Sequence, residues 1–270
     1  MPDRSCGHRG RSARAAPPQD QAAGLRRLFA PSEPHWVPVV LGPGQDLDNA
    51  AWLADLARAC VEQGARTLVV DAARAQVAAA FGLRARYDLF HAFSGDCAPF
   101  EACVPAGANL RILPAARALE QDGREPEPRR RFAAGVRALA VTADCALLVL
   151  PARHGRTLAG FCPTGGISDA IVVAGPGSVG ERTLIETMRS LLSVADIDTF
   201  RLLFQGTDPD RAGRLLSKLA AGSARQLGAR TSDAGSVRDA SAIRRLVRLV
   251  RCRSARAAGE RAGTALESVS

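Results

Sequence analysis

Short apolar segments that alternate with helical patterns constrain the fold of this chain more than any other feature. The segments are apolar throughout rather than at every second residue, which is typical of strands covered on both faces of a sheet. Strands that alternate with helices predict an α/β fold, a mainly parallel twisted sheet with helices on both faces. The predicted strands are residues 37–41, 67–71, 109–114, 145–150, 170–175 and 200–205, the predicted helices are residues 48–63, about 129–141, 180–193 and 208–221, and a polar, proline-rich surface loop is expected at 121–131.

The two ends of the chain differ in composition from its centre. Residues 1–19 are rich in Arg, Ser, Gly and Pro and are predicted to form a disordered basic head. Residues 20–30 are predicted to begin with a short amphipathic helix that Asp20 can cap. The α/β domain is expected over residues 35–240, followed at 241–270 by a basic amphipathic helix and a flexible tail.

The net charge of +9 is concentrated at the two ends and comes from Arg, because Lys218 is the one Lys in the chain. Such basic ends indicate an anionic partner, either a membrane surface or nucleic acid. The last predicted helix can lie on an anionic membrane with its apolar face inward and its Arg side chains near the headgroups. The alternative is a helix that packs on the sheet with its Arg side chains in solvent. The candidate membrane residues are Ile243, Arg244, Leu246, Val247, Arg248 and Val250. No run of about 18 apolar residues occurs, so no membrane-spanning helix is expected.

The turn after the first predicted strand, GPGQDLDNA at residues 42–50, lies where a P-loop would hold phosphate. A P-loop uses backbone N–H groups, a Lys on the phosphates and a Ser or Thr hydroxyl on Mg²⁺. This turn contains no Lys, Ser or Thr, and Asp46 and Asp48 place negative charge where the phosphates would lie. The residue types therefore argue against a conventional Mg-nucleotide site.

A dinucleotide site is a weaker alternative at the same turn. Gly42, Gly44 and Asp71 match part of the dinucleotide fingerprint, but Leu47 occupies the third glycine position. A complete but isolated GxGxxG at residues 175–180 lacks the acidic residue after the following strand. Tight connections between strand and helix explain both turns more simply.

Four stretches of the sequence together resemble one family. They are DQAAGLRRLF (20–29), NAAWLADLARACVEQGARTLVVDA (49–72), FGLRARYDLFHAFSGDCAPFEACVPAGANLRILPAA (81–116) and SDAIVVAGPGSVGERTLIETMRSL (168–191). They resemble segments of the flagellar number regulator family FlhG, also called FleN, whose members are MinD/ParA-type ATPases. The resemblance covers about residues 20–250. It implies a P-loop NTPase (MinD/ParA-like) architecture and a cytoplasmic protein that can attach peripherally to the inner membrane.

The departures from the family pattern fall on the residues that hold the nucleotide. When the family motif KGGVGKTN is aligned on Asn49, only Gly44 and Asn49 match it. The signature Lys is replaced by Gly42, the phosphate Lys by Leu47 and the Mg²⁺-binding Thr by Asp48.

The residues that the family uses after the second strand and at the Walker B strand are also largely replaced. Asp71 is kept after the second strand, but its partner two residues further on is Ala73. The Walker B strand ends in Leu150 instead of Asp. We therefore expect a degenerate nucleotide site of Gly42, Gly44, Asn49 and Asp71 on a pseudo-ATPase. ATP and Mg²⁺ are the family's cofactors, but no cofactor and no metal site are expected here.

The resemblance also implies partners. In the family, the DQA segment engages and stimulates FlhF, a GTPase of the signal-recognition-particle type. The matching residues are Asp20, Gln21, Leu25 and Arg26. A Gln on a short helix can orient a water at a partner's phosphate, although the segment could instead pack on its own domain.

The expected function is regulation of flagellar number or placement, through an FlhF-type GTPase and through flagellar switch or transcription proteins. An active ATPase with an unusual site and a ParA-like DNA-binding protein remain alternatives. The dimerisation that the family achieves around ATP stays open.

Overall fold

The computed structural model describes residues 34–42, 49–122, 126–161, 167, 169–175 and 181–248. They lie in the larger of two compact units of the chain, Ser32–Ser270. The predicted basic head and the predicted partner-binding helix, residues 1–19 and 20–30, lie outside the described residues, as does the tail from residue 249.

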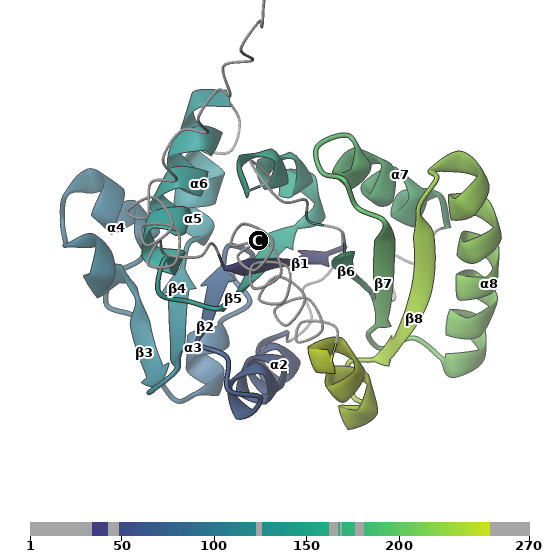
Figure 1. Ribbon diagram of the computed structural model, residues 1–270, viewed down its shortest axis with the longest axis horizontal. Helices are drawn as coiled ribbons and strands as arrows, with labels where there is room; N and C mark the ends of the chain where they lie inside the picture. The colour runs from purple at the N-terminus through teal and green to yellow at the C-terminus, as the bar shows by residue number, and fades with distance from the viewer. Residues whose placement is uncertain are drawn as a thin grey trace, which may run out of the picture. The chain divides into compact units, whose positions relative to one another are not determined.

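An eight-stranded sheet in the order β3-β4-β2-β5-β1-β6-β7-β8 forms the centre of the larger unit (Figure 1). Only the β3–β4 pair is antiparallel among the described strand pairs; the others are parallel. The predicted mainly parallel α/β sheet is therefore confirmed. The strands are β1 (His35–Leu41), β2 (Thr67–Asp71), β3 (Val104–Gly107), β4 (Leu110–Pro114), β5 (Cys145–Pro151), β6 (Asp169–Ala174), β7 (Thr199–Phe204) and β8 (Arg230–Ser236).

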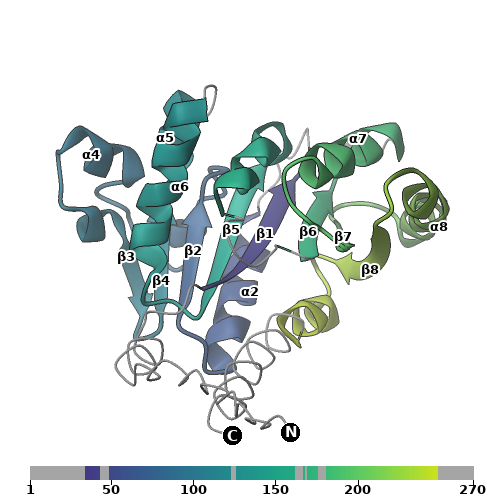
Figure 2. The same ribbon diagram turned by 45° about the horizontal axis from the view of Figure 1, so that its top comes forward.

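Helices cover both faces of the sheet (Figure 2). Alternate residues along each strand point to opposite faces, so that Val39 and Leu41 join one apolar cluster and Val40 joins the other. The first cluster is closed by α2, α3 and the last described helix, and the second by α5, α6, η2, α7 and α8. The helices are α2 (Ala50–Glu62), α3 (Val77–Ala80), α4 (Leu89–Ser94), α5 (Ala116–Asp122), α6 (Pro126–Ala140), α7 (Glu181–Leu192) and α8 (Pro209–Gln226), with 3-10 segments η1 (Pro99–Ala102) and η2 (Ala152–Phe161) and a last helix at residues 240–248.

The six strands and four helices predicted between residues 37 and 221 are present, with ends that move by one to a few residues. The predicted loop at 121–131 was wrong for most of its length, because α6 begins at Pro126. Proline is well suited to the first turn of a helix, where its missing N–H needs no partner. The segment is polar, yet from Pro126 onward it is helical rather than a loop.

Two edge strands, β3 and β8, were not predicted. β3 contains Pro105, and β8 reads RTSDAGS, so neither has the apolar run of an inner strand. The expected end of the domain near residue 240 also needs correction, because Leu246 and Val247 are buried in a core cluster. The domain therefore includes the last described helix.

Candidate functional site

The carboxyl ends of β1, β2 and β5 lie side by side, at the edge where parallel α/β folds bind their ligands. In the register of the sheet, Leu41 pairs with Pro151 and Asp71 pairs with Val149. The turn that follows β1, residues 43–48, lies outside the described residues and includes Gly44. Gly42 is buried, and its N–H donates to the carbonyl of Val173 at 3.0 Å. The sheet thus brings Gly42, Asn49 and Asp71 to one edge.

Asn49, which matches the family motif, is engaged by its own helix. Its side chain is 3% exposed, and its Oδ1 accepts from the indole Nε1 of Trp52 at 2.9 Å. Its backbone carbonyl also accepts from the N–H of Leu53. The Asn49 amide therefore helps to fix the start of α2 and the position of the buried Trp52 ring.

Asp71 is likewise engaged by its own chain. The residue is 6% exposed, and its carboxylate accepts from the backbone N–H of Ala75 at 2.8 Å and from that of Val77 at 3.2 Å. Burial raises the pKa of Asp71 above its ordinary value, and the bonds from backbone N–H groups oppose this rise in part. The carboxylate holds the turn after β2 and caps the first N–H of α3.

Leu150 occupies the position where the family has the Walker B Asp. It pairs with Val40 in the sheet and is 0% exposed, within the core. A Leu side chain has no oxygen to offer to a metal ion or to a water that bridges to one. The described side chains at this edge therefore do not fit Mg-nucleotide: Leu150 is apolar, and Asp71 is occupied by backbone N–H groups.

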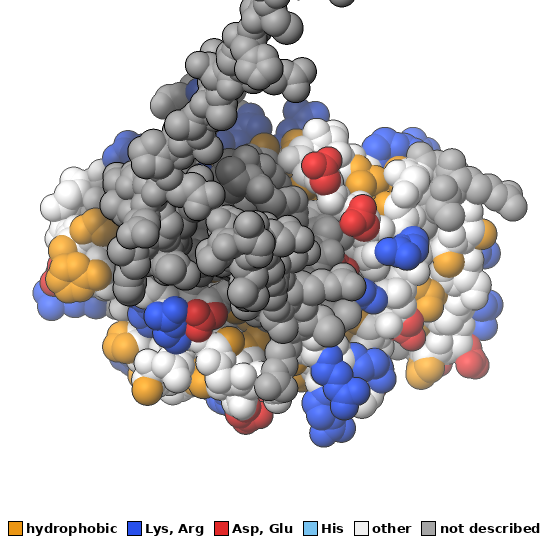
Figure 3. Space-filling view, viewed as in Figure 1, with side chains coloured by type: hydrophobic (Ala, Val, Ile, Leu, Met, Phe, Trp, Pro, Cys, Tyr) orange, Lys and Arg blue, Asp and Glu red, His pale blue; other side chains and the backbone are white. Residues whose placement is uncertain are grey.

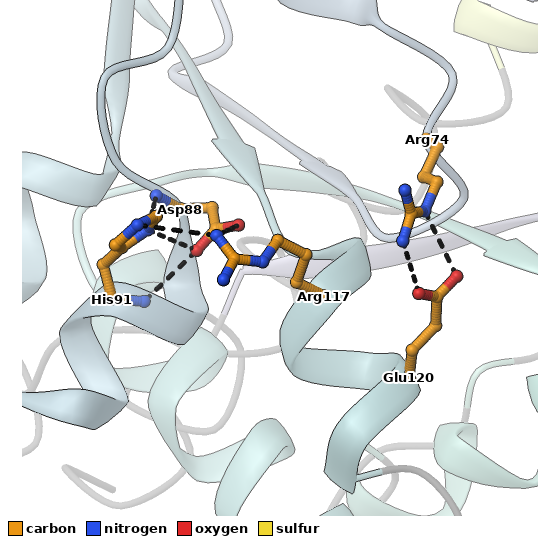
Figure 4. Close-up of polar contacts among 5 residues, drawn as sticks. All are labelled: Arg74, Asp88, His91, Arg117 and Glu120. Atoms are coloured by element: carbon orange, nitrogen blue, oxygen red, sulfur yellow. Dashed lines mark hydrogen bonds and ion pairs between the residues drawn. The ribbon is translucent and has the colours of Figure 1, made fainter.

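The turn held by Asp71 has an unusual backbone. Arg74 and Gln76 have φ values of 57° and 55°, in the left-handed region that non-glycine residues seldom adopt. The Arg74 guanidinium bonds to Glu120 on α5 at 2.5 Å and 3.2 Å, and this contact lowers the pKa of Glu120 (Figure 4). Arg153 in η2 lies 3.7 Å from the same carboxylate. The ion pairs link the β2 turn to α5 and η2.

A second charged group near α5 was missed from the sequence. Asp88 caps α4 and contacts His91 at 2.8 Å and Arg117 of α5 at 3.6 Å (Figure 4). The Asp88 oxygen accepts from the His91 N–H, and the His91 ring lies at the Asp88 N–H, which makes a reciprocal cap. The Asp-x-x-His spacing ahead of an apolar helix was the signal that could have predicted this group.

The last helix buries the apolar residues that were expected to enter a membrane. Ile243, Leu246 and Val247 are 8%, 2% and 4% exposed. Arg244 and Arg248 are exposed, and Figure 3 shows Lys and Arg side chains gathered over this helix. Val250 lies outside the described residues. Among the described helices, none is both long and apolar enough to cross a bilayer.

The residues expected to bind a GTPase could not be placed beside this edge. Asp20, Gln21, Leu25 and Arg26 all lie outside the described residues. The structure therefore brings Gly42, Asn49 and Asp71 to one edge of the sheet, while the nucleotide site and the partner segment both stay predictions.

The order of the sheet and the helices on its two faces define the architecture of MinD/ParA-type P-loop NTPases. The chain is similar to the MinD cell division protein of Aquifex aeolicus, with a TM-score of 0.51 and 16% identity over 74% of this chain and 80% of that one. It is also similar to Cyanothece McdA in an ATP complex, with a TM-score of 0.54 and 16% identity over 80% and 88%. A plasmid partition protein of Borrelia burgdorferi matches with a TM-score of 0.55 and 10% identity over 82% and 100%.

At these low identities, the three structural matches show a shared fold alone. No protein-family model matches the chain. No curated protein matches it either.

Proposed function

We propose that the chain is a regulator of flagellar number or placement that acts by binding proteins, on a MinD/ParA-type scaffold that has lost ATP hydrolysis. One observation supports the loss of ATP hydrolysis: the polar residues at the nucleotide edge bond to the chain itself. Asn49 holds Trp52, and Asp71 holds two backbone N–H groups. A buried Leu150 lies where the family has its Walker B Asp. The flagellar role rests on the resemblance of the sequence.

Isothermal titration with Mg-ATP and Mg-ADP tests the loss of the nucleotide site. We expect no binding heat up to millimolar nucleotide, because the edge offers neither Lys nor a free carboxylate in its described part. Gel filtration with and without nucleotide should then give the same oligomeric state. Micromolar affinity for either nucleotide would refute this part of the proposal and favour an active ATPase with an unusual site.

The partner in this proposal is an FlhF-type GTPase, engaged by residues 20–29. The support is the resemblance of the DQA segment, in which Gln21 would orient the attacking water. Gln21→Ala should abolish stimulation of the GTPase, whereas Gln19→Ala, a matched control outside the motif, should not. Both variants should keep the thermal stability of the parent chain. Undiminished stimulation by Gln21→Ala would contradict the assigned role.

Peripheral membrane association is a further part of the proposal. Since the apolar face of the 240–248 helix is buried in the core, we expect the docked helix to meet anionic lipid through Arg244 and Arg248. Each Arg near such a surface contributes about 1 kcal/mol. Flotation with phosphatidylserine vesicles should therefore fall in the Arg244→Glu/Arg248→Glu variant. Equal flotation of the variant, or none with the parent chain, would contradict the membrane role.

A further inference from the structure

The turn before α4, α4 itself and η1 carry four aromatic side chains, of which Phe100 is exposed and Tyr87, Phe90 and Phe93 are half-buried. The chain has nine Phe, one Tyr and two Trp, and four of the Phe and the Tyr fall within residues 81–100. Phe100, in η1, is 70% exposed, and Val141 is the other exposed large hydrophobic residue among those described. Figure 3 shows hydrophobic side chains beside basic ones over this part of the molecule. Exposed apolar groups rimmed by polar ones are typical of interaction sites, and Phe100 is the exposed aromatic residue of this group.

Arg side chains lie on the rings of this surface. The guanidinium carbon of Arg86 lies 5.0 Å from the ring centre of Tyr87, that of Arg117 lies 4.8 Å from Phe90, and that of Arg131 lies 4.9 Å from Phe93. We call the four aromatic and three basic residues the α4 surface: Tyr87, Phe90, Phe93, Phe100, Arg86, Arg117 and Arg131. Stacking of this kind restricts each guanidinium while its N–H edge can still reach a carboxylate.

The backbone beneath these rings holds them in place. Arg131 donates to the carbonyl of Phe93 at 2.8 Å, which ties α6 to α4. Gly135 of α6 leaves the room that the Phe93 ring fills, because a Cβ there would lie 2.6 Å from the ring. The α4 surface is therefore preorganised, which lowers the entropy lost when a partner binds.

The charge of the α4 surface favours an anionic partner. The Asp88 carboxylate is engaged by His91 and Arg117, and Glu101 accepts from the backbone N–H of Ala98 at 2.7 Å. Asp96 is the one further carboxylate within residues 84–101. The three stacked Arg residues are all exposed. Among residues 84–101 and the two stacked Arg of α5 and α6, the exposed charged side chains are therefore four Arg (Arg84, Arg86, Arg117 and Arg131) and two carboxylates (Asp96 and Glu101), an excess of positive charge.

We propose that the α4 surface docks an acidic segment of a partner protein that also carries apolar side chains. An apolar side chain of that segment packs on Phe100, and its carboxylates accept from Arg86, Arg117 and Arg131. Aromatic residues and Arg are the types that dominate the binding energy of protein interfaces. Exposed Phe100 supplies the apolar anchor, and charge complementarity sets the acidic character of the occupant. This docking uses no residue of segment 20–29 and none of Gly42, Asn49 and Asp71.

Fluorescence anisotropy on the full chain tests the docking with short labelled peptides. The probe is a peptide in which Glu and Leu alternate, and its two controls replace Glu by Lys or Leu by Ser. We expect the Glu/Leu peptide to bind and both control peptides to bind at least about tenfold more weakly, since each lacks one of the two contacts. Added salt should weaken binding of the Glu/Leu peptide.

Matched variants of the chain place the binding on this surface. Phe100→Ser should weaken the Glu/Leu peptide about tenfold, and Arg86→Gln a few-fold. Val141→Ser and Arg182→Gln, which alter an exposed apolar residue and an exposed Arg elsewhere, should leave the affinity unchanged. Unfolding curves of Phe100→Ser and the parent chain should coincide.

Three results would overturn the proposal. The first is no binding of the Glu/Leu peptide at millimolar concentration, or binding that Phe100→Ser leaves intact. The second is tighter binding of oligothymidylate that Phe100→Ser abolishes, which would make the surface a stacking site for single-stranded nucleic acid. The third is self-association by sedimentation that Phe100→Ser abolishes, which would make the surface an interface between two copies of the chain.

Discussion

The nucleotide edge and the α4 surface use polar residues in opposite ways. At the edge, Asn49 and Asp71 are buried and bond to their own chain. On the α4 surface, the polar side chains of Arg86, Arg117 and Arg131 are exposed. The comparison shows that a residue kept from a motif is not a binding group once the fold has bonded its polar atoms. The α4 surface matches no motif, yet its Arg side chains remain accessible to a partner, whereas the polar atoms at the nucleotide edge do not.

Asp71→Ala should destabilise the chain more than the other substitutions below. A small effect would contradict the contrast between the buried nucleotide edge and the exposed α4 surface. The change leaves the half-buried N–H of Ala75 and the buried N–H of Val77 without their acceptor. Removal of the buried charge offsets part of the loss, so we expect the free energy of unfolding to fall by about 2–3 kcal/mol. Urea unfolding followed by circular dichroism at neutral pH measures it. An unchanged midpoint would mean that the carboxylate is not a structural cap.

Asp71→Asn isolates the charge of the same residue. Because burial raises the folded-state pKa of Asp71, the folded state holds this proton more tightly than the unfolded state. The wild-type chain should therefore lose stability, relative to Asp71→Asn, as the pH rises through the interval between the unfolded and the raised folded pKa. Paired unfolding curves across the acidic range measure the difference, and a difference that stays constant with pH would contradict the raised pKa.

Gly135→Ala tests the support of the α4 surface. Ala is the better helix former by about 1 kcal/mol, but its Cβ would meet the Phe93 ring at 2.6 Å. Because the Phe93 ring lies between α4 and α6, we expect the cost of overpacking to exceed the gain in helix propensity. The free energy of unfolding should fall by a net of about 1–2 kcal/mol. Thermal unfolding checks this, with Gly213→Ala as the control, because the Cβ of that helix glycine would meet no atom within 4 Å.

Gln76→Gly should have a smaller effect of the opposite sign. Gln76 has a left-handed backbone at the start of α3, a conformation that glycine adopts without the steric cost that other residues meet. The greater freedom of glycine in the unfolded chain offsets part of this gain. The change should therefore stabilise the domain by about 0.5–1 kcal/mol. A rise in the urea midpoint without a change in slope would support it, whereas a fall would mean that the Gln76 side chain stabilises the turn.

Phe100→Ser should have the smallest effect on stability of these substitutions. A negligible effect would distinguish the exposed α4 surface from the buried nucleotide edge. Its side chain is 70% exposed, and exposed substitutions away from special features change stability by less than about 0.5 kcal/mol. Differential scanning calorimetry should give the parent melting temperature. A loss as large as that of Asp71→Ala would show that Phe100 is structural and that the α4 surface is part of the core.

The inner strands could be predicted because each is an apolar run that needs no neighbour to be recognised. Strand β8, with its polar sequence, could not, because it forms only by adding to the edge of β7. The alignment of Leu150 with the family's Walker B Asp followed from the sequence, but the complete burial of Leu150 did not. The bonds of Asp71 were also hidden, because they depend on the left-handed turn at Arg74 and Gln76.

The sequence by itself determined the α/β class, the succession of the inner strands and the loss of cationic groups from the turn after β1, because apolar periodicity and residue type are local properties. Tertiary structure alone decided which polar atoms are engaged and which are exposed. Asp71 is closed off by N–H groups of its own turn, Ile243 is buried against the domain, and Phe100 remains in solvent. Burial and hydrogen bonding depend on what packs against a side chain, and residues distant in the sequence supply that packing.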